Sequence, residues 1–245
     1  MAVWNPLAVH FTGPQTDESD SEPNPFLDYR LTVRFVAPSG HVTDVPGYFA
    51  GDGQGSGTGT QWVARFAADE PGEWRYCASF RAGPKVAVEL DPAAGQPAAF
   101  DGAGGTFTVA PAPPDAPGFY RWGRLEYAGG HYLKFRDGPY WIKGGTNSPE
   151  NFLAYAGFED TADAGGNVPG FLHSYAAHVA DWREGDPTLP GAADEGKGII
   201  GALNYLSDQG VNSIYFLPMN LGGDGGDTWP FLAPEDVTHY DVGKL

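Results

Sequence analysis

Apolar and polar side chains alternate along short stretches of the first 110 residues. Residues 30–35 read RLTVRF and residues 62–66 read WVARF, so an apolar residue stands at every second position. A period of two is typical of a strand with one buried face. Further apolar runs, bounded by Pro and Gly, lie at 3–11, 41–48, 73–80, 85–90 and 106–110. About seven short strands of this kind predict an all-β sandwich of the immunoglobulin type.

The pattern changes after a proline-rich segment. Ala110–Gly118 reads APAPPDAPG, and four prolines in nine residues disfavour the interior of a sheet. We expect a linker here. The predicted organisation is therefore multidomain, with a β-sandwich at 1–115 and a second domain at 116–245.

The second half carries one helical and two strand-like patterns. Residues 140–145, YWIKGG, predict a mostly apolar strand. Residues 198–209 have apolar side chains at helical spacing, and Gly210 is suited to cap that helix. Residues 211–219, VNSIYFLPM, predict a buried parallel strand. Asp241 and Lys244 suggest the opening of another helix.

This order of strand, helix and strand favours the start of a β/α series. Two parallel strands cannot cover both of their faces alone. We therefore expect the sequence to be a fragment, or its second domain to be incomplete.

Charge limits the possible partners. The chain has 31 acidic and 14 basic residues, for a formal net charge of −17. This balance disfavours nucleic acid and anionic membrane surfaces as partners. An acidic polymer would be a poor ligand unless the few arginines cluster, whereas a neutral, hydroxyl-rich ligand is compatible.

Membrane insertion is not expected, because no stretch approaches the roughly 18 apolar residues of a spanning helix. The first residues, MAVWNPLAVHF, have no basic region followed by a long apolar core, so no signal peptide is visible.

The sequence predicts neither a metal nor another cofactor. Cys77 is the single cysteine, which excludes an internal disulfide, and its place inside an apparent strand predicts a buried thiol. His173 and His178 stand about 140° apart on a helix, a poor geometry for chelation. We expect His178 to lie on a surface helix beside Asp181.

Several stretches, taken in order, resemble one known family. The stretches GPQTDESDSEPNPFLDYRLTVRFVAPSG, VPGYFAGDG and PGEWRY resemble the DUF5060 domain, an immunoglobulin-like module at the N-terminus of bacterial glycoside-hydrolase-like proteins. The later stretches KGGTNSPENFLAY, HVADWREGDPT, KGIIGALNYLSDQGVNSIYFLPMN and GGDGGDTWPF are similar to the first part of the (β/α)₈ barrel that follows it. The chain departs from that pattern at Leu189–Glu195, where a Trp-containing segment is expected.

The resemblance implies that the second domain is the first β/α units of a truncated TIM-type barrel, and it implies where a sugar would bind. Barrel enzymes have their sites at the carboxyl ends of the strands, which here places Asn147, Glu150 and Asn151 at the outlet of the first strand. Their donors and acceptors suit sugar hydroxyls. Alternatively, Ser148 and Pro149 simply start a short helix, as N-cap and first residue. Both interpretations can hold together.

The outlet of the second strand supplies four more candidates. Asn220, Asp224, Asp227 and Trp229 follow residues 211–219, and carboxylates beside an aromatic face suit a neutral sugar. The alternative is a flexible loop with solvated acids.

The function that these observations favour is carbohydrate processing. The predicted partner is a poly- or oligosaccharide, and the predicted protein is a glycoside hydrolase with the sandwich as an accessory domain. In barrel glycosidases the catalytic carboxylates commonly come from later strands, so no catalytic residue is assigned here. The alternatives are a non-catalytic carbohydrate-binding or surface-adhesion protein and an inactive truncated product. The function favours a secreted, periplasmic or cell-surface location.

Overall fold

The computed structural model describes the chain apart from residues 147–149, 159–160, 162–171, 190–193 and 220–227. It divides into two compact units, Met1–Ile142 and Lys143–Leu245. The proline-rich segment at 110–118 lies inside the first unit. The predicted end of the sandwich domain near residue 115 stays a prediction.

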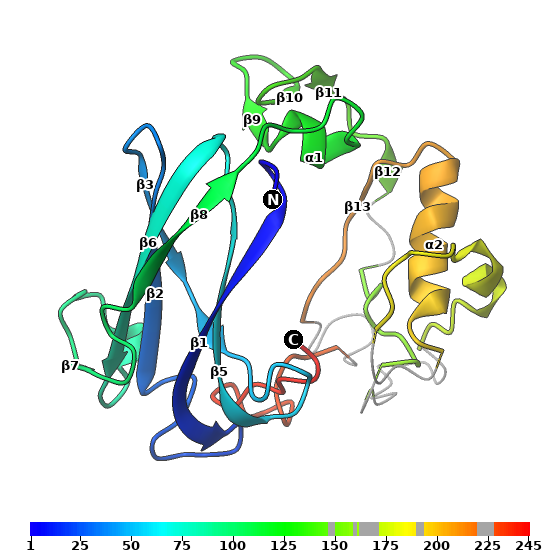
Figure 1. Cartoon of the computed structure of the whole chain (residues 1–245). Helices are drawn as coiled ribbons and strands as arrows, with labels where there is room; N and C mark the ends of the chain where they lie inside the picture. Colours follow the sequence, from blue (N-terminus) through cyan, green and yellow to red (C-terminus); the bar gives the residue numbers. More distant parts are fainter. Residues whose placement is uncertain (147–149, 159–160, 162–171, 190–193, 220–227) are drawn as a thin grey trace. The chain divides into compact units, whose positions relative to one another are not determined.

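The first unit is built on two antiparallel sheets (Figure 1). One sheet has the strand order β1-β5-β4, with β1 at Pro6–Asp17, β4 at Tyr48–Phe49 and β5 at Thr58–Ala67. The other has the order β3-β2-β6-β7, with β8 also paired to β6. Its strands are β2 at Tyr29–Val36, β3 at Val42–Pro46, β6 at Gly72–Ala82, β7 at Gln96–Pro97 and β8 at Gly104–Val109.

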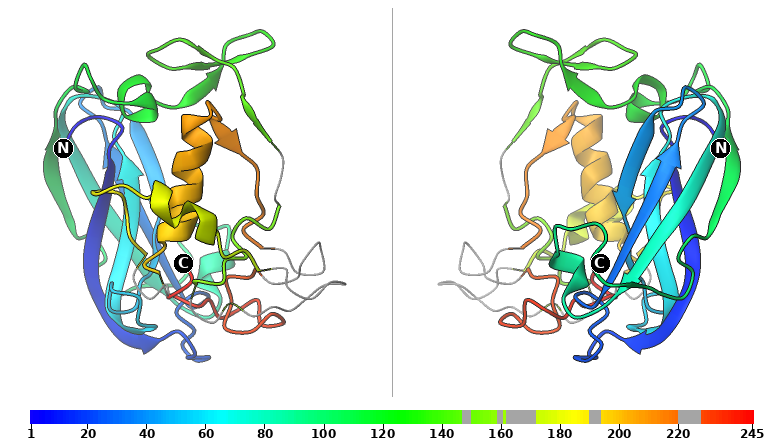
Figure 2. Two further views of the ribbon diagram at one scale, coloured as in Figure 1. Left: turned by 90° about the vertical axis from the view of Figure 1, so that its right-hand side faces the viewer. Right: turned by 90° about the vertical axis from the view of Figure 1, so that its left-hand side faces the viewer.

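The two sheets lie face to face (Figure 2), and aromatic side chains fill the space between them. The ring centroids of Phe35 on β2 and Phe66 on β5 are 4.2 Å apart, and those of Trp62 on β5 and Phe80 on β6 are 4.8 Å apart. The alternation in residues 30–35 buries Leu31, Val33 and Phe35, as it predicts. The β-rich first half is confirmed.

Two local predictions in this unit are wrong. The thiol of Cys77 is exposed, because Trp74, Ala78 and Phe80 take the inward positions of β6 and leave the odd-numbered residues outside. The apolar run 85–90 forms a 3-10 helix, η1, at Val86–Val88 instead of a strand. Only Val86 of that helix is buried, so the run has no apolar face to offer a sheet.

The first unit ends in a small three-stranded sheet. A short helix, α1 at Gly118–Trp122, precedes β9 at Leu125–Tyr127, β10 at Leu133–Phe135 and β11 at Tyr140–Trp141. The order is β11-β10-β9 and all pairs are antiparallel. The strand predicted at 140–145 is therefore two strands. Its first residues belong to this sheet, and its last residue begins β12.

The second unit contains one parallel β-α-β arrangement. Strand β12, Gly145–Thr146, pairs in parallel with β13, Ser213–Ile214, and helix α2, Lys197–Asp208, lies between them in the chain. A 3-10 helix, η2, covers Ala176–Asp181 and packs against α2. The predicted helix is confirmed, and Gly210 follows it with φ +81°.

Two predictions for the second unit need correction. The strand predicted at 211–219 is limited to Ser213–Ile214, because its described partner β12 is itself only two residues long. Tyr215, Phe216 and Met219 are exposed. Residues 241–244 form a hydrogen-bonded turn rather than the start of a helix.

Three side chains form the core of the second unit. Phe152, Tyr155 and Ile199 are buried together, so the segment after β12 packs on the first turn of α2. Among the described residues, no helix has the length and apolar character needed to cross a bilayer.

Candidate functional site

The two parallel strands define a carboxyl edge and an amino edge. At the carboxyl edge, the backbone N–H of Leu217 donates to the carbonyl oxygen of Glu150 over 2.8 Å. At the amino edge, the N–H of Gly144 donates to Oδ1 of Asn212 over 2.8 Å. Ligands of parallel sheets bind outside the carboxyl edge. Glu150 and Asn151 therefore lie where a ligand is expected.

Asn151 is the best-defined polar group at this edge. Its side chain is buried, with the residue 6% exposed, and Oδ1 lies 2.9 Å from Nε2 of His173. Its amide nitrogen Nδ2 is buried, and no described group accepts a hydrogen bond from it. A buried donor without an acceptor costs about 1–3 kcal/mol. Nδ2 is thus a buried donor that lacks an acceptor among the described residues.

The partner of Asn151 is held in place by its own neighbours. The backbone of His173 forms a bridge beside Tyr155, with hydrogen bonds of 2.7 Å to Ala154 and 2.9 Å from Ala156. Its ring stacks on Tyr175, with centroids 5.1 Å apart. Backbone and ring contacts together fix the imidazole that orients Asn151.

Two phenols, those of buried Tyr155 and half-buried Tyr175, support this arrangement. The hydroxyl of Tyr175 donates to the carbonyl oxygen of Phe152 over 2.9 Å, and burial raises the pKa of Tyr175 well above its usual range. Burial also raises the pKa of Tyr155, as does the hydrogen bond that its hydroxyl donates to Asp194. Both phenols therefore stay protonated and serve as hydrogen-bond donors.

Asp194 joins Tyr155 to the start of helix α2. Its carboxylate accepts the N–H groups of Gly196 and Gly198 over 3.1 and 2.8 Å, in addition to the Tyr155 hydroxyl. Burial alone would raise the pKa of Asp194, but these three hydrogen bonds outweigh burial and lower it. The positive end of the helix dipole also stabilises an ionised carboxylate at this point.

The predicted site residues divide into described and undescribed groups. Glu150 and Asn151 lie side by side at the carboxyl edge, with Glu150 exposed and Asn151 buried. Asn147, Asn220, Asp224 and Asp227 lie outside the described residues, as do Ser148 and Pro149 of the alternative helix start.

Trp229 is half-buried, and its indole N–H is buried without a hydrogen-bond partner among the described residues. The ammonium of Lys244 lies 5.1 Å from the centre of its ring, and the same ammonium is 3.5 Å from Asp241. One face of the indole is therefore occupied by a cation. A sugar can stack only on the other face.

Sequence reasoning did not identify His173, Tyr155 or Asp194 as parts of this site. It considered His173 only as a metal ligand together with His178. In the structure His178 pairs instead with Asp181, at 2.9 Å on η2, which confirms the expected neighbour. No group of three or more His, Cys, Asp or Glu side chains is placed to hold a metal in the part of the chain that the structure describes.

Comparison with known proteins gives one family match and one structural likeness. Residues 1–81 match the family model described as "Domain of unknown function (DUF5060)". No curated protein matches the chain. A solved structure from Bacteroides vulgatus, described as a "putative glycoside hydrolase", is 18% identical with a TM-score of 0.48. The alignment covers 95% of this chain but only 43% of that protein.

Proposed function

We propose that this chain is the N-terminal part of a carbohydrate-active protein of the glycoside-hydrolase type. In this proposal the β-sandwich is an accessory domain, and the carboxyl edge of β12 and β13 belongs to the sugar-binding surface of an α/β barrel. The observation that carries the proposal is the buried amide nitrogen of Asn151, which has no described acceptor at the edge where parallel sheets bind ligands.

The β-α-β arrangement supports the barrel part of the proposal. A (β/α)₈ barrel repeats a strand, a helix and a parallel strand, and it places its site at the carboxyl ends of the strands. Strand β12, helix α2 and strand β13 would be its first such unit. The barrel itself would require strands beyond these two.

A sugar hydroxyl can supply the acceptor that Nδ2 of Asn151 lacks at this edge. It can accept a hydrogen bond from Nδ2 of Asn151 and donate one to the exposed carboxylate of Glu150. A site that hydrogen-bonds a ligand hydroxyl with a buried group rejects analogues without that hydroxyl, because the buried group is then left unpaired. Asn151 would therefore act as a specificity residue.

Hydrolysis requires catalytic groups in addition to a binding site. It takes two carboxylic acids on either side of the glycosidic bond. We assign no catalytic residue, and under this proposal the catalytic pair comes from later strands of the barrel. Binding without cleavage is the second candidate function. It is favoured by the same observation, because the Asn151 amide needs no carboxylate pair in order to hold a sugar.

An array of neutral oligosaccharides tests the proposal. The chain should bind a subset of them, and Asn151→Asp should lose that binding because it replaces the donor with an acceptor. Asn212→Asp makes the same chemical change at the amino edge and should bind like the unaltered chain. Binding that survives Asn151→Asp, or absence of binding to every glycan, overturns the proposal.

A second assay separates the two functions. Release of reducing ends from the bound glycan, by the protein in its natural length, identifies a hydrolase. Binding with the glycan left intact identifies a carbohydrate-binding protein.

A further inference from the structure

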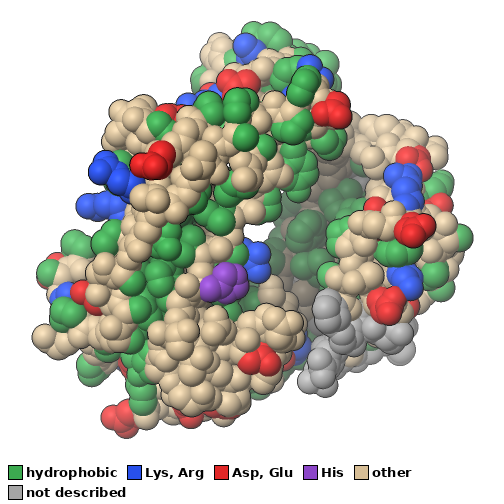
Figure 3. Space-filling model, in the orientation of Figure 1, with side chains coloured by type: hydrophobic (Ala, Val, Ile, Leu, Met, Phe, Trp, Pro, Cys, Tyr) green, Lys and Arg blue, Asp and Glu red, His purple; other side chains and the backbone are tan. Residues whose placement is uncertain are grey.

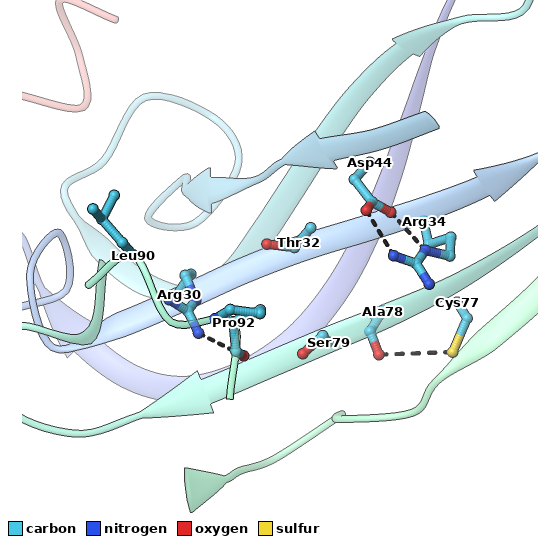
Figure 4. A pocket seen from close by; sticks show the side chains of 9 residues that line it. All are labelled: Arg30, Thr32, Arg34, Asp44, Cys77, Ala78, Ser79, Leu90 and Pro92. Carbon is cyan, nitrogen blue, oxygen red and sulfur yellow. Dashed lines mark hydrogen bonds and ion pairs between the residues drawn. The ribbon is translucent and has the colours of Figure 1, made fainter. Parts of the chain in front are cut away.

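A pocket of about 440 Å³ lies on the outer face of the first unit (Figure 4). Its floor is formed by the neighbouring strands β2 and β6, and one wall is formed by the loop after η1. The lining side chains are Arg30, Thr32, Arg34, Asp44, Cys77, Ala78, Ser79, Leu90 and Pro92.

The loop that forms the wall is clamped by arginine. The guanidinium of Arg30 donates to five main-chain carbonyl oxygens between Val86 and Ala94, at 2.8–3.4 Å. Arg81, directly opposite Arg30 on β6, donates to the carbonyl oxygens of Ala93 and Gly95 and shares that of Ala94 with Arg30. These bonds hold the loop in a fixed position, so the pocket is preformed.

Arginines cluster on this face although the chain as a whole is acidic. Four of its nine arginines, Arg30, Arg34, Arg75 and Arg81, occupy outward positions of β2 and β6. Figure 3 shows basic side chains projecting along the left edge, where this sheet lies. Alternation along a strand places residues i, i+2 and i+4 on one face. The clustering therefore follows from the sequence period and the register of the two strands.

The side chains that line the pocket carry a net charge of one positive unit, from Arg30, Arg34 and Asp44. Arg34 is neutralised by Asp44, whose carboxylate accepts two hydrogen bonds of 2.7 Å from it. The hydrogen bonds of Arg30 all go to uncharged carbonyl oxygens, which leave its charge in place. Glu89 and Asp91 belong to the loop, but they are not among the side chains that line the pocket.

Donors remain available between the two arginines. Nη1 of Arg34 and the hydroxyls of Thr32 and Ser79 have no hydrogen-bond partner among the described residues, and Thr32 and Ser79 are directly opposite each other. The apolar side chains of Leu90 and Pro92 stand beside these polar groups. Donors, a surplus positive charge and an apolar wall together match a sugar ring that carries an anionic group.

We propose that this pocket binds an acidic sugar unit through its carboxylate or sulfate oxygens. The sugar part of this inference rests on the proposed function. The anionic group receives hydrogen bonds from Arg34 and Ser79, and the C–H face of the ring lies against Leu90. The accessory domain thereby selects acidic polysaccharides, although the chain as a whole repels them.

Calorimetric titration of the whole chain tests the proposal with matched ligands. Tetragalacturonate should bind, and its methyl ester, which has the same shape without the charge, should bind at least about tenfold more weakly because it lacks the charge-assisted hydrogen bonds. Added NaCl should weaken the binding of the acid but not that of the ester. A sulfated tetrasaccharide in a parallel titration distinguishes sulfate from carboxylate as the preferred group.

Three variants locate the binding. Arg34→Gln should lower the affinity for tetragalacturonate about tenfold or more, and Ser79→Ala severalfold. Arg34 and Asp44 are exposed, so their loss should leave the fold intact. Arg65→Gln removes an exposed arginine from β5 in the other sheet and should leave the affinity unchanged.

Equal binding of the acid and the ester, or unchanged affinity in both Arg34→Gln and Ser79→Ala, overturns the inference. Neutral glycan binding that depends on Asn151, together with no binding of tetragalacturonate, would overturn it and leave the proposed function standing. Acidic glycan binding that depends on Arg34, together with no neutral glycan binding that depends on Asn151, would support the pocket and contradict the proposed sugar site at β12 and β13.

Discussion

Oδ1 of Asn151 lies 2.9 Å from Nε2 of His173, a residue 22 positions further along the chain. An amide oxygen can only accept, so Nε2 of His173 carries the proton in this pair. The same bond turns the amide nitrogen of Asn151 away from His173. His173 is therefore a positioning residue, and Asn151 is the group that would meet a ligand.

Replacing His173 with a shorter residue should weaken glycan binding, although His173 itself does not contact the ligand in this proposal. We expect His173→Ala to lower the affinity for a neutral oligosaccharide severalfold, because the Asn151 amide is then free to rotate. His173→Gln keeps a donor near Oδ1 and should retain more of the affinity than His173→Ala. Calorimetric titration measures both. Equal affinities in the two variants would contradict a positioning role.

The carboxylate of Asp194 should contribute measurably to folding stability. Asp194→Ala removes the acceptor for Tyr155, Gly196 and Gly198, and we expect a loss of about 1–2 kcal/mol in the free energy of unfolding. Tyr155→Phe removes one of these bonds and should cost about 1 kcal/mol. Urea denaturation followed by tryptophan fluorescence measures both changes.

A neighbouring acid supplies the control. Glu195 is exposed, and Lys197 is its one ion-pair partner among the described residues, so Glu195→Ala should change stability by well under about 1 kcal/mol. The contribution of Asp194 also depends on pH. Its pKa is lower in the folded chain, so its stabilising effect is present above its usual pKa and is lost as the pH falls. A stability of Asp194→Ala equal to that of Glu195→Ala would refute this account.

Asp236 should titrate well below an ordinary aspartate. The hydroxyl and N–H of Thr238, with a smaller contribution from His239, lower its pKa from 3.8 to about 2. Because the folded pKa is the lower one, the stabilisation is present above pH 3.8 and disappears as the pH falls toward about 2. Carboxyl NMR gives the midpoint directly.

Thr238→Val removes the hydroxyl but keeps the N–H. The pKa of Asp236 should therefore rise part of the way to 3.8 in this variant. An unchanged midpoint in Thr238→Val would show that the hydroxyl has no such effect.

Cys77 should react in the folded chain. Its thiol is exposed on the outer face of β6 and makes long contacts of 3.8 Å to the carbonyl oxygens of Ala78 and Gly102. An aromatic disulfide reagent should label one thiol per chain without denaturant, at a rate near that of the unfolded chain. Protection of the thiol by a factor of ten or more would contradict its exposed position.

Local patterns predicted local structure well. The alternation in residues 30–35 fixes which side chains of β2 face the core, and the helical spacing in 198–209 locates α2. An alternation of the same period along β6 places Cys77 on the outer face, with Arg75 and Ser79. The expectation of a buried thiol was wrong because it considered the strand and not the phase of the residue within it.

Structure that depends on a distant partner was not predictable in this way. The apolar run 211–219 is long enough for a strand, but only Ser213–Ile214 is paired, because strand length is set by the partner. The pair of Asn151 and His173, and the pair of Tyr155 and Asp194, join segments 22 and 39 residues apart. No spacing rule in one sequence reports such contacts.

The side-chain amide of Asn151 offers the most direct test of sugar binding at the carboxyl edge of β12 and β13. Its ¹⁵N–¹H₂ signals, assigned by comparison with Asn151→Asp, can be followed while the best neutral glycan from the array is titrated into the chain. We predict that these signals shift with the same affinity as the binding curve, while those of Asn212 at the amino edge stay in place. If the chain is saturated with glycan and the Asn151 signals do not move, the account is contradicted.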